Sequence, residues 1–325
     1  MEYTRSTAKA WARENLRGQW TTMMTPFTPE DELDERGLAH NIDHVAQLGT
    51  QGLGFSWNMG EFWSLTREER YRLLELAPTL VRRRMRTAFQ VTHTSLAEVV
   101  ALCHAAERAG YDLAIIAAPY LMTKTEGQVI DFVTKVSERT EIGLAFYNSP
   151  QFGIVLSPPA LAKLADLPTL VAIKEASFNM QLSIDTHLLA GSKAVVSTPD
   201  EEIFFFEPYY AFHQQVMFAN TSDWRFDSPT RHDYVPFIDL ATSGRLEEAR
   251  ARYAAIWPVK ALSRRWWSRL VVRTGGALPV QLVKHWGELM GMAGGPVRAP
   301  ILPLTEAERA ELKSDLAALA ARPRP

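Results

Sequence analysis

A lysine and a tyrosine in the middle of the chain have the side chains needed for covalent carbonyl chemistry. Lys174 ends the apolar run at residues 170–174, and Tyr147 ends the preceding run at residues 143–147. Burial lowers the pKa of a lysine because the ammonium loses solvation, and the neutral amine attacks carbonyl carbons. A neighbouring tyrosine can act as general acid and base. The pattern predicts imine chemistry at Lys174, unless its side chain reaches solvent or pairs with Glu175.

Convergence of these two side chains requires neighbouring parallel strands. Short apolar runs alternate with segments of helical period, which is the pattern of repeated βα units. Adjacent strands lie about 4.8 Å apart, so the residues that end them meet. Eight strands are predicted, at residues 21–25, 52–57, 87–91, 113–117, 143–147, 170–174, 194–197 and 215–219. Eight such units close most simply into a (β/α)8 TIM barrel, with its active site at the carboxyl ends of the strands.

Helical patterns lie between the predicted strands and continue after them. Those between strands include residues 34–48, 66–81, 95–108, 125–137 and 157–164, and several begin at a capping Ser, Thr or Asp. Beyond residue 225 the strand pattern stops, and helices are predicted at residues 247–257, 261–272, 279–289 and 306–321. We therefore predict a barrel over residues 1–225, preceded by a short N-terminal segment, and C-terminal helices over residues 226–325 that complete and flank it.

Composition narrows the class of binding partner. The 325 residues include 35 Lys and Arg and 37 Asp and Glu, so no basic field attracts nucleic acid or an anionic membrane. The chain has a single cysteine, no apolar run of about 18 residues, and no apolar signal-peptide core. We expect a cytoplasmic protein that binds small molecules.

Residues 18–312 resemble the dihydrodipicolinate synthase and N-acetylneuraminate lyase superfamily of class I, Schiff-base-forming aldolases. Several motifs of this superfamily occur here in the same order along the chain. The resemblance rests on residues 25–27, 60–61, 65–70, 119–120, 147–150, 173–177 and 295–300. It implies a barrel with C-terminal helices, in which Lys174 forms an imine with pyruvate or another 2-keto acid and Tyr147 shuttles protons. No metal or organic cofactor is implied. The implied partners are pyruvate, an aldehyde and further copies of the chain in a tetramer or dimer.

Departures from the family pattern concern the substrate site. Trp57-Asn58-Met59 stands where much of the family has Gly-Thr-Thr, so the proton-relay and carboxylate-binding threonines are absent. Leu121 replaces a second tyrosine that reaches into a neighbouring subunit's site. Phe152 replaces the arginine that binds the carboxylate of the synthase's second substrate. These replacements argue against synthesis in the diaminopimelate pathway.

The replacements predict an apolar, partly aromatic substrate rim. Its members are Trp57, Met59, Trp63, Leu121 and Phe152, with polar contacts from Asn58 and Thr198. Such a rim suits a flat hydrophobic group, although the same aromatics could pack the core or a subunit interface. The resemblance then favours hydratase-aldolases, which add water to benzylidenepyruvate-type substrates and split them into pyruvate and an aromatic aldehyde. A 2-keto-3-deoxy sugar acid aldolase or dehydratase is the alternative.

Two other classes of function remain open in the sequence. His40 and His44 lie four residues apart on a predicted helix and could bind the metal of a metal-dependent aldolase, but no third ligand has a recognisable spacing. Loss of the two threonines would also fit a non-catalytic 2-keto-acid-binding protein.

His93 follows the third strand and is expected to bind loop backbone or face the site. Residues 264–267, with Arg273, are expected to pack helices rather than bind nucleic acid.

Overall fold

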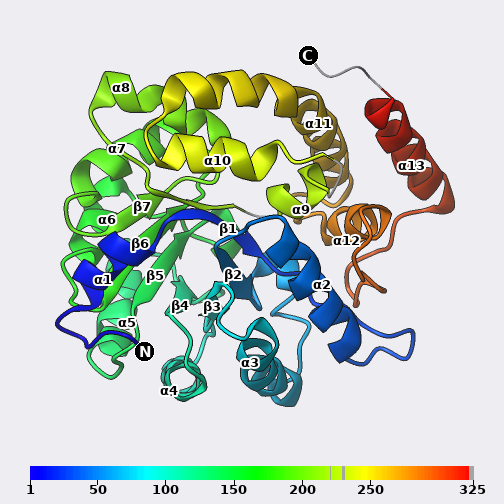
Figure 1. The fold of residues 1–325 in the computed structure, drawn as a ribbon. Coiled ribbons are helices and arrows are strands. Elements are labelled where there is room, and N and C mark those ends of the chain that lie inside the picture. The colour runs from blue at the N-terminus through cyan, green and yellow to red at the C-terminus, as the bar shows by residue number, and fades with distance from the viewer. Residues whose placement is uncertain (220, 229–230, 322–325) are drawn as a thin grey trace.

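The computed structural model describes residues 1–219, 221–228 and 231–321. Its eight parallel strands follow the order β7-β6-β5-β4-β3-β2-β1-β8, with helices outside them (Figure 1). The strands are β1 (Gly18–Thr22), β2 (Gly52–Phe55), β3 (Arg86–Gln90), β4 (Leu113–Ala117), β5 (Leu144–Asn148), β6 (Leu170–Glu175), β7 (Val195–Ser197) and β8 (Val216–Phe218). The predicted (β/α)8 barrel is confirmed, although β1 begins three residues earlier than predicted.

Side-chain hydrogen bonds link β7 and β8, which are the first and last strands of the hydrogen-bonded order. The Phe218 backbone N–H in β8 donates to Ser197 Oγ at the end of β7, at 2.8 Å. Gln214, just before β8, accepts from the Thr198 N–H at 2.7 Å and donates to the Thr198 carbonyl at 3.1 Å. These contacts bring the carboxyl end of β7 beside β8 and so help to close the barrel.

Helices cover the barrel, and several of them are capped by a local side chain. Thr66 and Thr125 form capping boxes at the starts of α3 and α5, in which each side chain accepts from the backbone N–H three residues on. The covering helices are α1 (Ala8–Asn15), α2 (Glu35–Gln47), α3 (Arg67–Val81), α4 (Leu96–Ala109), α5 (Glu126–Ser137), α6 (Pro158–Leu164), α7 (Met180–Ala190) and α10 (Tyr234–Thr242). No predicted segment corresponds to α1, α7 or α10, and α10 packs against β1 and β8.

Short helical turns follow several strands, and three longer helices end the chain. The turns are η1 (Asn58–Gly60), η2 (Pro150–Phe152), η3 (Glu201–Phe206), α8 (Glu207–Tyr210) and α9 (Ser222–Phe226). The final helices are α11 (Leu246–Arg273), α12 (Val280–Leu289) and α13 (Glu306–Ala320). The prediction of two helices at residues 247–257 and 261–272 is wrong, because α11 continues through Pro258. Ile256 and Val259 are buried on either side of the proline, so packing holds the helix together.

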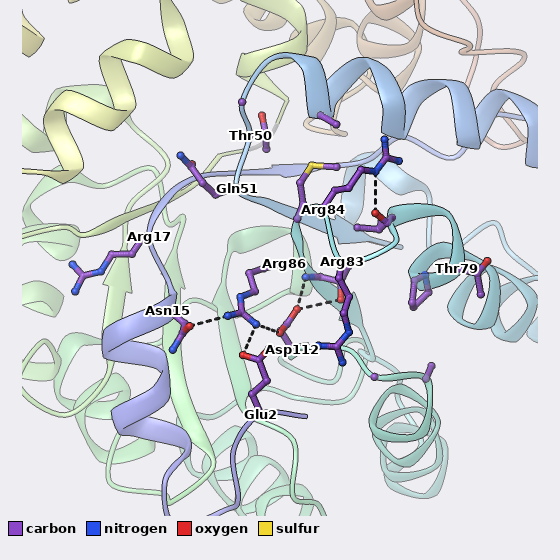
Figure 2. Close-up of a pocket in the computed structure, with 18 of the residues that line it drawn as sticks. Glu2, Asn15, Arg17, Thr50, Gln51, Thr79, Arg83, Arg84, Arg86 and Asp112 are labelled. Atoms are coloured by element: carbon purple, nitrogen blue, oxygen red, sulfur yellow. Dashed lines mark hydrogen bonds and ion pairs between the residues drawn. The ribbon is translucent and has the colours of Figure 1, made fainter.

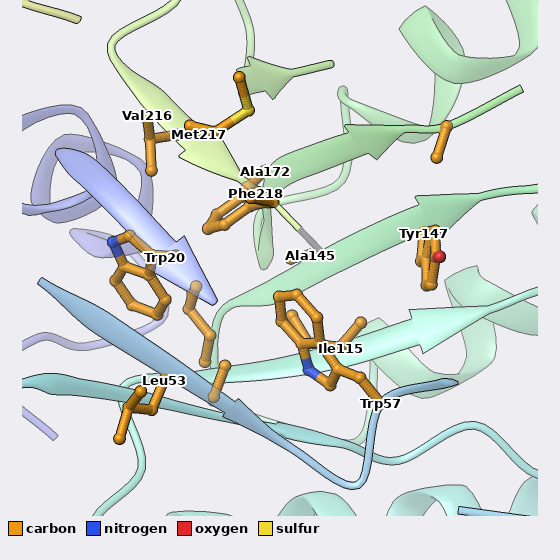
Figure 3. Packing of buried hydrophobic residues seen from close by; sticks show 14 of the residues in the cluster. Trp20, Leu53, Trp57, Ile115, Ala145, Tyr147, Ala172, Val216, Met217 and Phe218 are labelled. Atoms are coloured by element: carbon orange, nitrogen blue, oxygen red, sulfur yellow. The ribbon is translucent and has the colours of Figure 1, made fainter. Parts of the chain in front are cut away.

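Large aromatic side chains fill the barrel interior (Figure 3). Trp20 lies edge-on to Phe218 with ring centroids 5.5 Å apart, and Trp57 lies edge-on to the same ring at 6.3 Å. A Cβ on Gly52 would lie 2.0 Å from the Trp20 indole, and one on Gly54 would lie 2.2 Å from the Trp57 indole. The glycines of β2 therefore make room for the two tryptophans. Among the described helices, none is both long and apolar enough to cross a membrane.

Candidate active site

Lys174 and Tyr147 lie side by side at the carboxyl end of the barrel. They are register partners on β6 and β5, and they are 1% and 5% exposed. Lys174 Nζ lies 4.8 Å from the centroid of the Tyr147 ring and 4.7 Å from that of Trp57. It also donates to the carbonyl of Ala219, just after β8, at 3.4 Å. The structure thus brings together an amine, a phenol and an indole that were separate motifs in the sequence.

Burial prepares the Lys174 amine for nucleophilic attack. Loss of solvation lowers the pKa of Lys174 to about 7, so a large fraction of the amine is neutral near neutral pH. Burial also raises the pKa of Tyr147 above its ordinary value, against a smaller lowering by the Ser149 hydroxyl. The phenol therefore stays protonated and can donate a proton to an oxygen bound beside the amine.

The two other buried lysines of the described chain are paired with carboxylates. Lys284 Nζ lies 2.6 Å from Glu61 Oε1, and Lys260 Nζ lies 2.5 Å from Glu201 Oε2 and 3.5 Å from Asp200 Oδ1. Although burial lowers the pKa of Lys260, the neighbouring carboxylates raise it overall above its ordinary value. These ammonium groups stabilise the fold as ion pairs. Burial lowers the pKa of Lys284 as well, but Glu61 acts against that change, whereas burial lowers the pKa of Lys174 to about 7.

A group of aromatic rings, which we term the aromatic cluster, extends from Tyr147 toward the surface. The Phe152 ring lies edge-on to Tyr147 at 5.5 Å between centroids and stacks on Phe62 at 6.2 Å. Tyr120 and Trp63 lie edge-on to Phe62 at 6.4 and 5.5 Å. Trp63 is 40% exposed, so the cluster reaches solvent. The sequence analysis missed Phe62, although it directly follows the Gly60-Glu61 motif.

The loop after β2 places unsatisfied polar atoms near Lys174. Asn58 and Met59 are buried in η1. Asn58 Oδ1 and Trp57 Nε1 are buried without a hydrogen-bond partner among the described residues. Thr25 Oγ1 donates to the Gly60 carbonyl at 2.7 Å, which fixes the loop. A polar ligand could therefore find partners at Asn58 and Trp57.

The late motif at residues 295–300 supports this loop from outside. Arg298 forms ion pairs of 2.7 Å with Glu69 and with Asp31, and its guanidinium lies 3.9 Å from the centroid of the Phe27 ring. Gly295 has φ of 69°, and a Cβ there would lie 2.0 Å from the Phe27 carbonyl. The motif therefore holds the loops after β1 and β2 in place without reaching Lys174.

A cavity of about 340 Å³ lies between the loops after β6, β7 and β8 and helix α11. Thr198 lines it, and its Oγ1 lies 3.3 Å from the buried His187 Nε2. Other lining residues are Glu175, Phe178, Asp200, Ser222, Arg225 and Trp267. Ser222 comes three residues after Ala219, whose carbonyl contacts Lys174. Among the described residues, neither Lys174 nor Tyr147 lines the cavity.

Not every predicted residue joins the site. Leu121 is 74% exposed at φ of 76°, and its neighbour Tyr120 contacts the aromatic cluster instead. Trp57 is buried in the barrel interior (Figure 3), so it contacts Lys174 Nζ from within the barrel and is not a rim residue. His93 Nδ1 accepts from the Ser95 N–H at 2.9 Å, which confirms a bond to loop backbone.

Among residues 1–219, 221–228 and 231–321, no third ligand joins the two histidines considered as metal ligands. His40 Nε2 bonds to the Gly291 carbonyl at 2.7 Å, and His44 is half-buried. In the described ranges, the one group of three potential ligands is Asp200, Glu201 and Glu202. Lys260 Nζ contacts all three carboxylates, so an ammonium occupies their centre.

The cluster at residues 264–267 packs C-terminal helices, as predicted. Trp266 is buried, and its Nε1 donates to Asp315 of α13 at 2.8 Å. Arg265 pairs with the same carboxylate, and Arg273 pairs with Glu308 at 2.6 Å. These contacts hold α13 against α11.

A larger hollow, of about 1030 Å³, opens at the amino end of the barrel (Figure 2). Arg86 crosses it and pairs with Glu2 at 2.7 Å and with Asp112 at 3.0 Å. Asp112 also accepts from the Thr87 N–H at 2.8 Å. Five of the charged residues that line the hollow, Glu2, Arg83, Arg84, Arg86 and Asp112, form ion pairs, and none of the predicted catalytic residues lines it.

Comparisons with known proteins agree with this geometry. A 4-hydroxy-tetrahydrodipicolinate synthase from Methanothrix thermoacetophila is 25% identical over 303 residues, which cover 93% of this chain and 96% of the relative. One from Methanothermobacter thermautotrophicus is 34% identical over 163 residues, covering 50% and 58%.

Solved structures share the fold. YagE, a prophage protein of the dihydrodipicolinic acid synthase family from E. coli in complex with pyruvate, superposes with a TM-score of 0.80 at 23% identity, covering 94% of this chain and 99% of that one. The chloride-inhibited dihydrodipicolinate synthase from Acinetobacter baumannii, complexed with pyruvate, has a TM-score of 0.79 at 20% identity, covering 94% and 100%.

The model of the dihydrodipicolinate synthetase family matches residues 15–319, which is nearly the whole chain. Lys174 and Tyr147 both fall within the match. The chain therefore belongs to the dihydrodipicolinate synthetase family, whose members are aldolase-type lyases that act through a lysine Schiff base.

Proposed function

We propose that this protein is a pyruvate-dependent hydratase-aldolase that forms or cleaves the bond between pyruvate and an aromatic aldehyde. The buried amine of Lys174, with its pKa lowered to about 7, supports attack on a 2-keto acid. Two of the similar structures hold pyruvate, which supports this keto acid as the donor. The proposed chemistry needs no metal or organic cofactor, since the imine itself withdraws electrons.

In the proposed reaction, Lys174 Nζ attacks the keto carbon of the substrate and forms a carbinolamine. Tyr147 donates its phenolic proton to the departing hydroxyl, which leaves as water and yields a protonated imine. Water then adds across the conjugated carbon–carbon double bond. Loss of the proton from the new hydroxyl breaks the adjacent carbon–carbon bond, which releases the aldehyde and leaves an enamine. Protonation and hydrolysis of the enamine release pyruvate and restore Lys174.

The position of Phe152 is the observation that favours an aromatic aldehyde. The ring lies edge-on to Tyr147 and stacks on Phe62, so the wall beside the proton donor is apolar. A second substrate would meet the apolar ring of Phe152 here, with the Arg70 guanidinium 5.6 Å from the centroid of the neighbouring Phe62 ring. An aryl ring can pack edge-on or offset against this cluster. This is why we propose an acceptor different from that of the named synthases.

An aldehyde screen with pyruvate tests the proposal. The acceptors are benzaldehyde, glyceraldehyde and aspartate semialdehyde, which represent aromatic, sugar and synthase-type substrates. We expect the highest kcat/KM with benzaldehyde, and a Phe152→Arg variant should lose that preference. Reaction with glyceraldehyde alone would favour the sugar acid aldolase, and reaction with aspartate semialdehyde alone would favour the synthase.

A further inference from the structure

A glutamine in the barrel interior has an amide without a hydrogen-bond partner. Gln90 ends β3 and is fully buried. Among the described residues, neither its Oε1 nor its Nε2 has a partner. A buried polar group that stays unpaired is unfavourable, and such groups in folded proteins commonly bind a ligand or a water molecule. The amide of Gln90 is therefore a candidate binding group.

The sheet directs this amide into the barrel. A Cβ on Gly54 would lie 2.2 Å from the Trp57 indole, so Gly54 faces the interior that Trp57 occupies. Ala88 is the register partner of Gly54 and faces the same way. Side chains two residues apart on a strand share a face, so Gln90 also points inward. Its register partner Ile115 lies in the same interior (Figure 3).

The strand register places Gln90 near the reactive pair. Ile115 pairs in turn with Ala145 on β5, and Tyr147 is the next inward-facing residue after Ala145. Gln90 is thus one inward-facing position from the row that contains Tyr147 and Lys174. The neighbouring inward positions 88, 117 and 145 are all alanine, whose small side chains take up little of the interior.

Arg70 links Gln90 to the aromatic cluster. Its Nη2 donates to the Gln90 carbonyl at 2.5 Å and to the Thr92 carbonyl at 3.1 Å. The same guanidinium lies 5.6 Å from the centroid of the Phe62 ring. Gln90 therefore lies between the cluster and the row of Lys174, where the carbon–carbon double bond of a substrate bound to both would be.

The unpaired polar atoms in this part of the barrel include both donors and acceptors. Gln90 Oε1 and Asn58 Oδ1 accept hydrogen bonds, whereas Gln90 Nε2 and Trp57 Nε1 donate them. A carboxylate could use only the donors, and the acceptor oxygens would repel it. A water molecule donates and accepts, so it can satisfy atoms of both kinds. Water is also the co-substrate of the proposed hydration.

We propose that Gln90 positions the water molecule that adds to the double bond of the substrate. The inference rests on the proposed hydratase-aldolase function and concerns its hydration step. The water oxygen forms a bond to the carbon that carries the aryl group, and the double-bond electrons move to the imine nitrogen, which gives an enamine. The water proton passes to Tyr147, whose phenol gave up its proton when the imine formed. Gln90 accepts a hydrogen bond from the water and exchanges no proton, so it is a positioning residue.

The test compares two glutamine variants on two substrates. Benzylidenepyruvate must be hydrated before it is cleaved, whereas its hydrated form, 4-hydroxy-2-oxo-4-phenylbutanoate, is cleaved without that step. Gln90→Met should lower kcat for benzylidenepyruvate about tenfold to a hundredfold and leave kcat for the hydrated substrate within about threefold. Gln281 provides the matched control, because its amide is also buried without a partner among the described residues but lies in α12. Gln281→Met should leave both values unchanged.

Borohydride trapping of the pyruvate imine separates a water site from a carboxylate site. The pyruvate concentration for half-maximal trapping at Lys174 should be the same in Gln90→Met as in the wild type. A marked increase would mean that the amide binds the keto acid, and would overturn the proposal. Equal losses of kcat on both substrates would also overturn it, because a packing defect affects both. If Gln90→Met does not fold, Gln90→Asn withdraws the amide by one methylene and should lower the ratio of the two kcat values in the same direction.

The wild type separates this inference from the proposed function. A wild type that cannot use benzylidenepyruvate would overturn the proposed function and the role of Gln90 together. Normal turnover of benzylidenepyruvate by the wild type, with an unchanged ratio of the two kcat values in Gln90→Met, would overturn the role of Gln90 alone.

Discussion

The two ends of the barrel differ in how their charged side chains are paired. At the amino end, the hollow of about 1030 Å³ is crossed by Arg86, which binds Glu2 and Asp112 (Figure 2). Arg84, on the same wall, pairs with Asp43 at 2.7 Å. At the carboxyl end, the hollow between the loops after β6, β7 and β8 is about a third as large. At the same end of the barrel, the amine of Lys174 has a pKa lowered to about 7.

The comparison shows that cavity size does not identify the reactive end. Opposite charges that bind one another stabilise structure and leave little free energy for a ligand. The amine of Lys174 is instead desolvated, which disfavours its charged form. Its neutral form is a nucleophile, and it lies beside the protonated phenol of Tyr147. The carboxyl end therefore holds the groups that suit the proposed chemistry, while the amino end holds ion pairs between neighbouring segments.

Removal of the Lys174 amine gives the largest expected effect. Lys174→Ala should lose turnover by several orders of magnitude and lose the adduct that borohydride traps with pyruvate, because no other group can form the imine. The exposed Lys193, which pairs with Asp166, provides the control. Lys193→Ala should retain both activity and adduct, and an adduct in Lys174→Ala would contradict the assignment.

Removal of the Tyr147 hydroxyl should slow the reaction without preventing imine formation. We expect Tyr147→Phe to lower kcat about 10²- to 10⁴-fold, the range for loss of a general acid and base. Tyr111 is the matched control, since it is also buried and precedes β4 at the amino end. Tyr111→Phe should leave kcat within about twofold. Similar losses in both variants would show that a general loss of packing, and not proton transfer, explains the result.

The buried Glu61–Lys284 pair should affect stability more than chemistry. Glu61→Gln leaves the Lys284 ammonium buried without its carboxylate, and we expect the free energy of unfolding to fall by about 3–5 kcal/mol. The double variant Glu61→Gln/Lys284→Met removes both charges and should recover much of that loss. Urea denaturation measures both values. A double variant that is less stable than the single one would contradict this explanation.

Loss of Asp112 at the amino end gives the smallest expected change. Asp112→Ala removes the acceptor of the Thr87 N–H and a partner of Arg86, so the free energy of unfolding should fall by about 1–3 kcal/mol. Values of kcat/KM measured with pyruvate should remain within about twofold of the wild type. A loss of activity larger than the loss of folded protein would mean that the amino end contributes to the chemistry.

The sequence predicted most of the fold because strand and helix patterns are local. The alternation of apolar runs and amphipathic segments was sufficient to predict the eight strands. Tyr147 and Lys174 end successive apolar runs, and they are register partners on β5 and β6. Pro258 was misleading, since its local preference to end a helix is outweighed by the packing of α11. The short helix α10 was missed between longer patterns.

Much of the site could not be predicted, because it depends on contacts between distant segments. Phe62 belongs to the site because its ring stacks on Phe152, which lies ninety residues further along the chain. No local sequence pattern predicts such a contact. Leu121 was expected at the site from its motif, yet the backbone leaves it exposed.

The pH dependence of imine formation at Lys174 tests most directly whether this amine is the reactive group. The wild type is mixed with pyruvate at a series of pH values, reduced with borohydride, digested and examined by mass spectrometry. Because only the neutral amine attacks, the initial rate of adduct formation at Lys174 should rise with pH, bend near the pKa of about 7 and level off at higher pH. A rate that keeps rising toward about pH 10, the ordinary range of a solvated lysine, or an adduct on another lysine, would contradict the assignment.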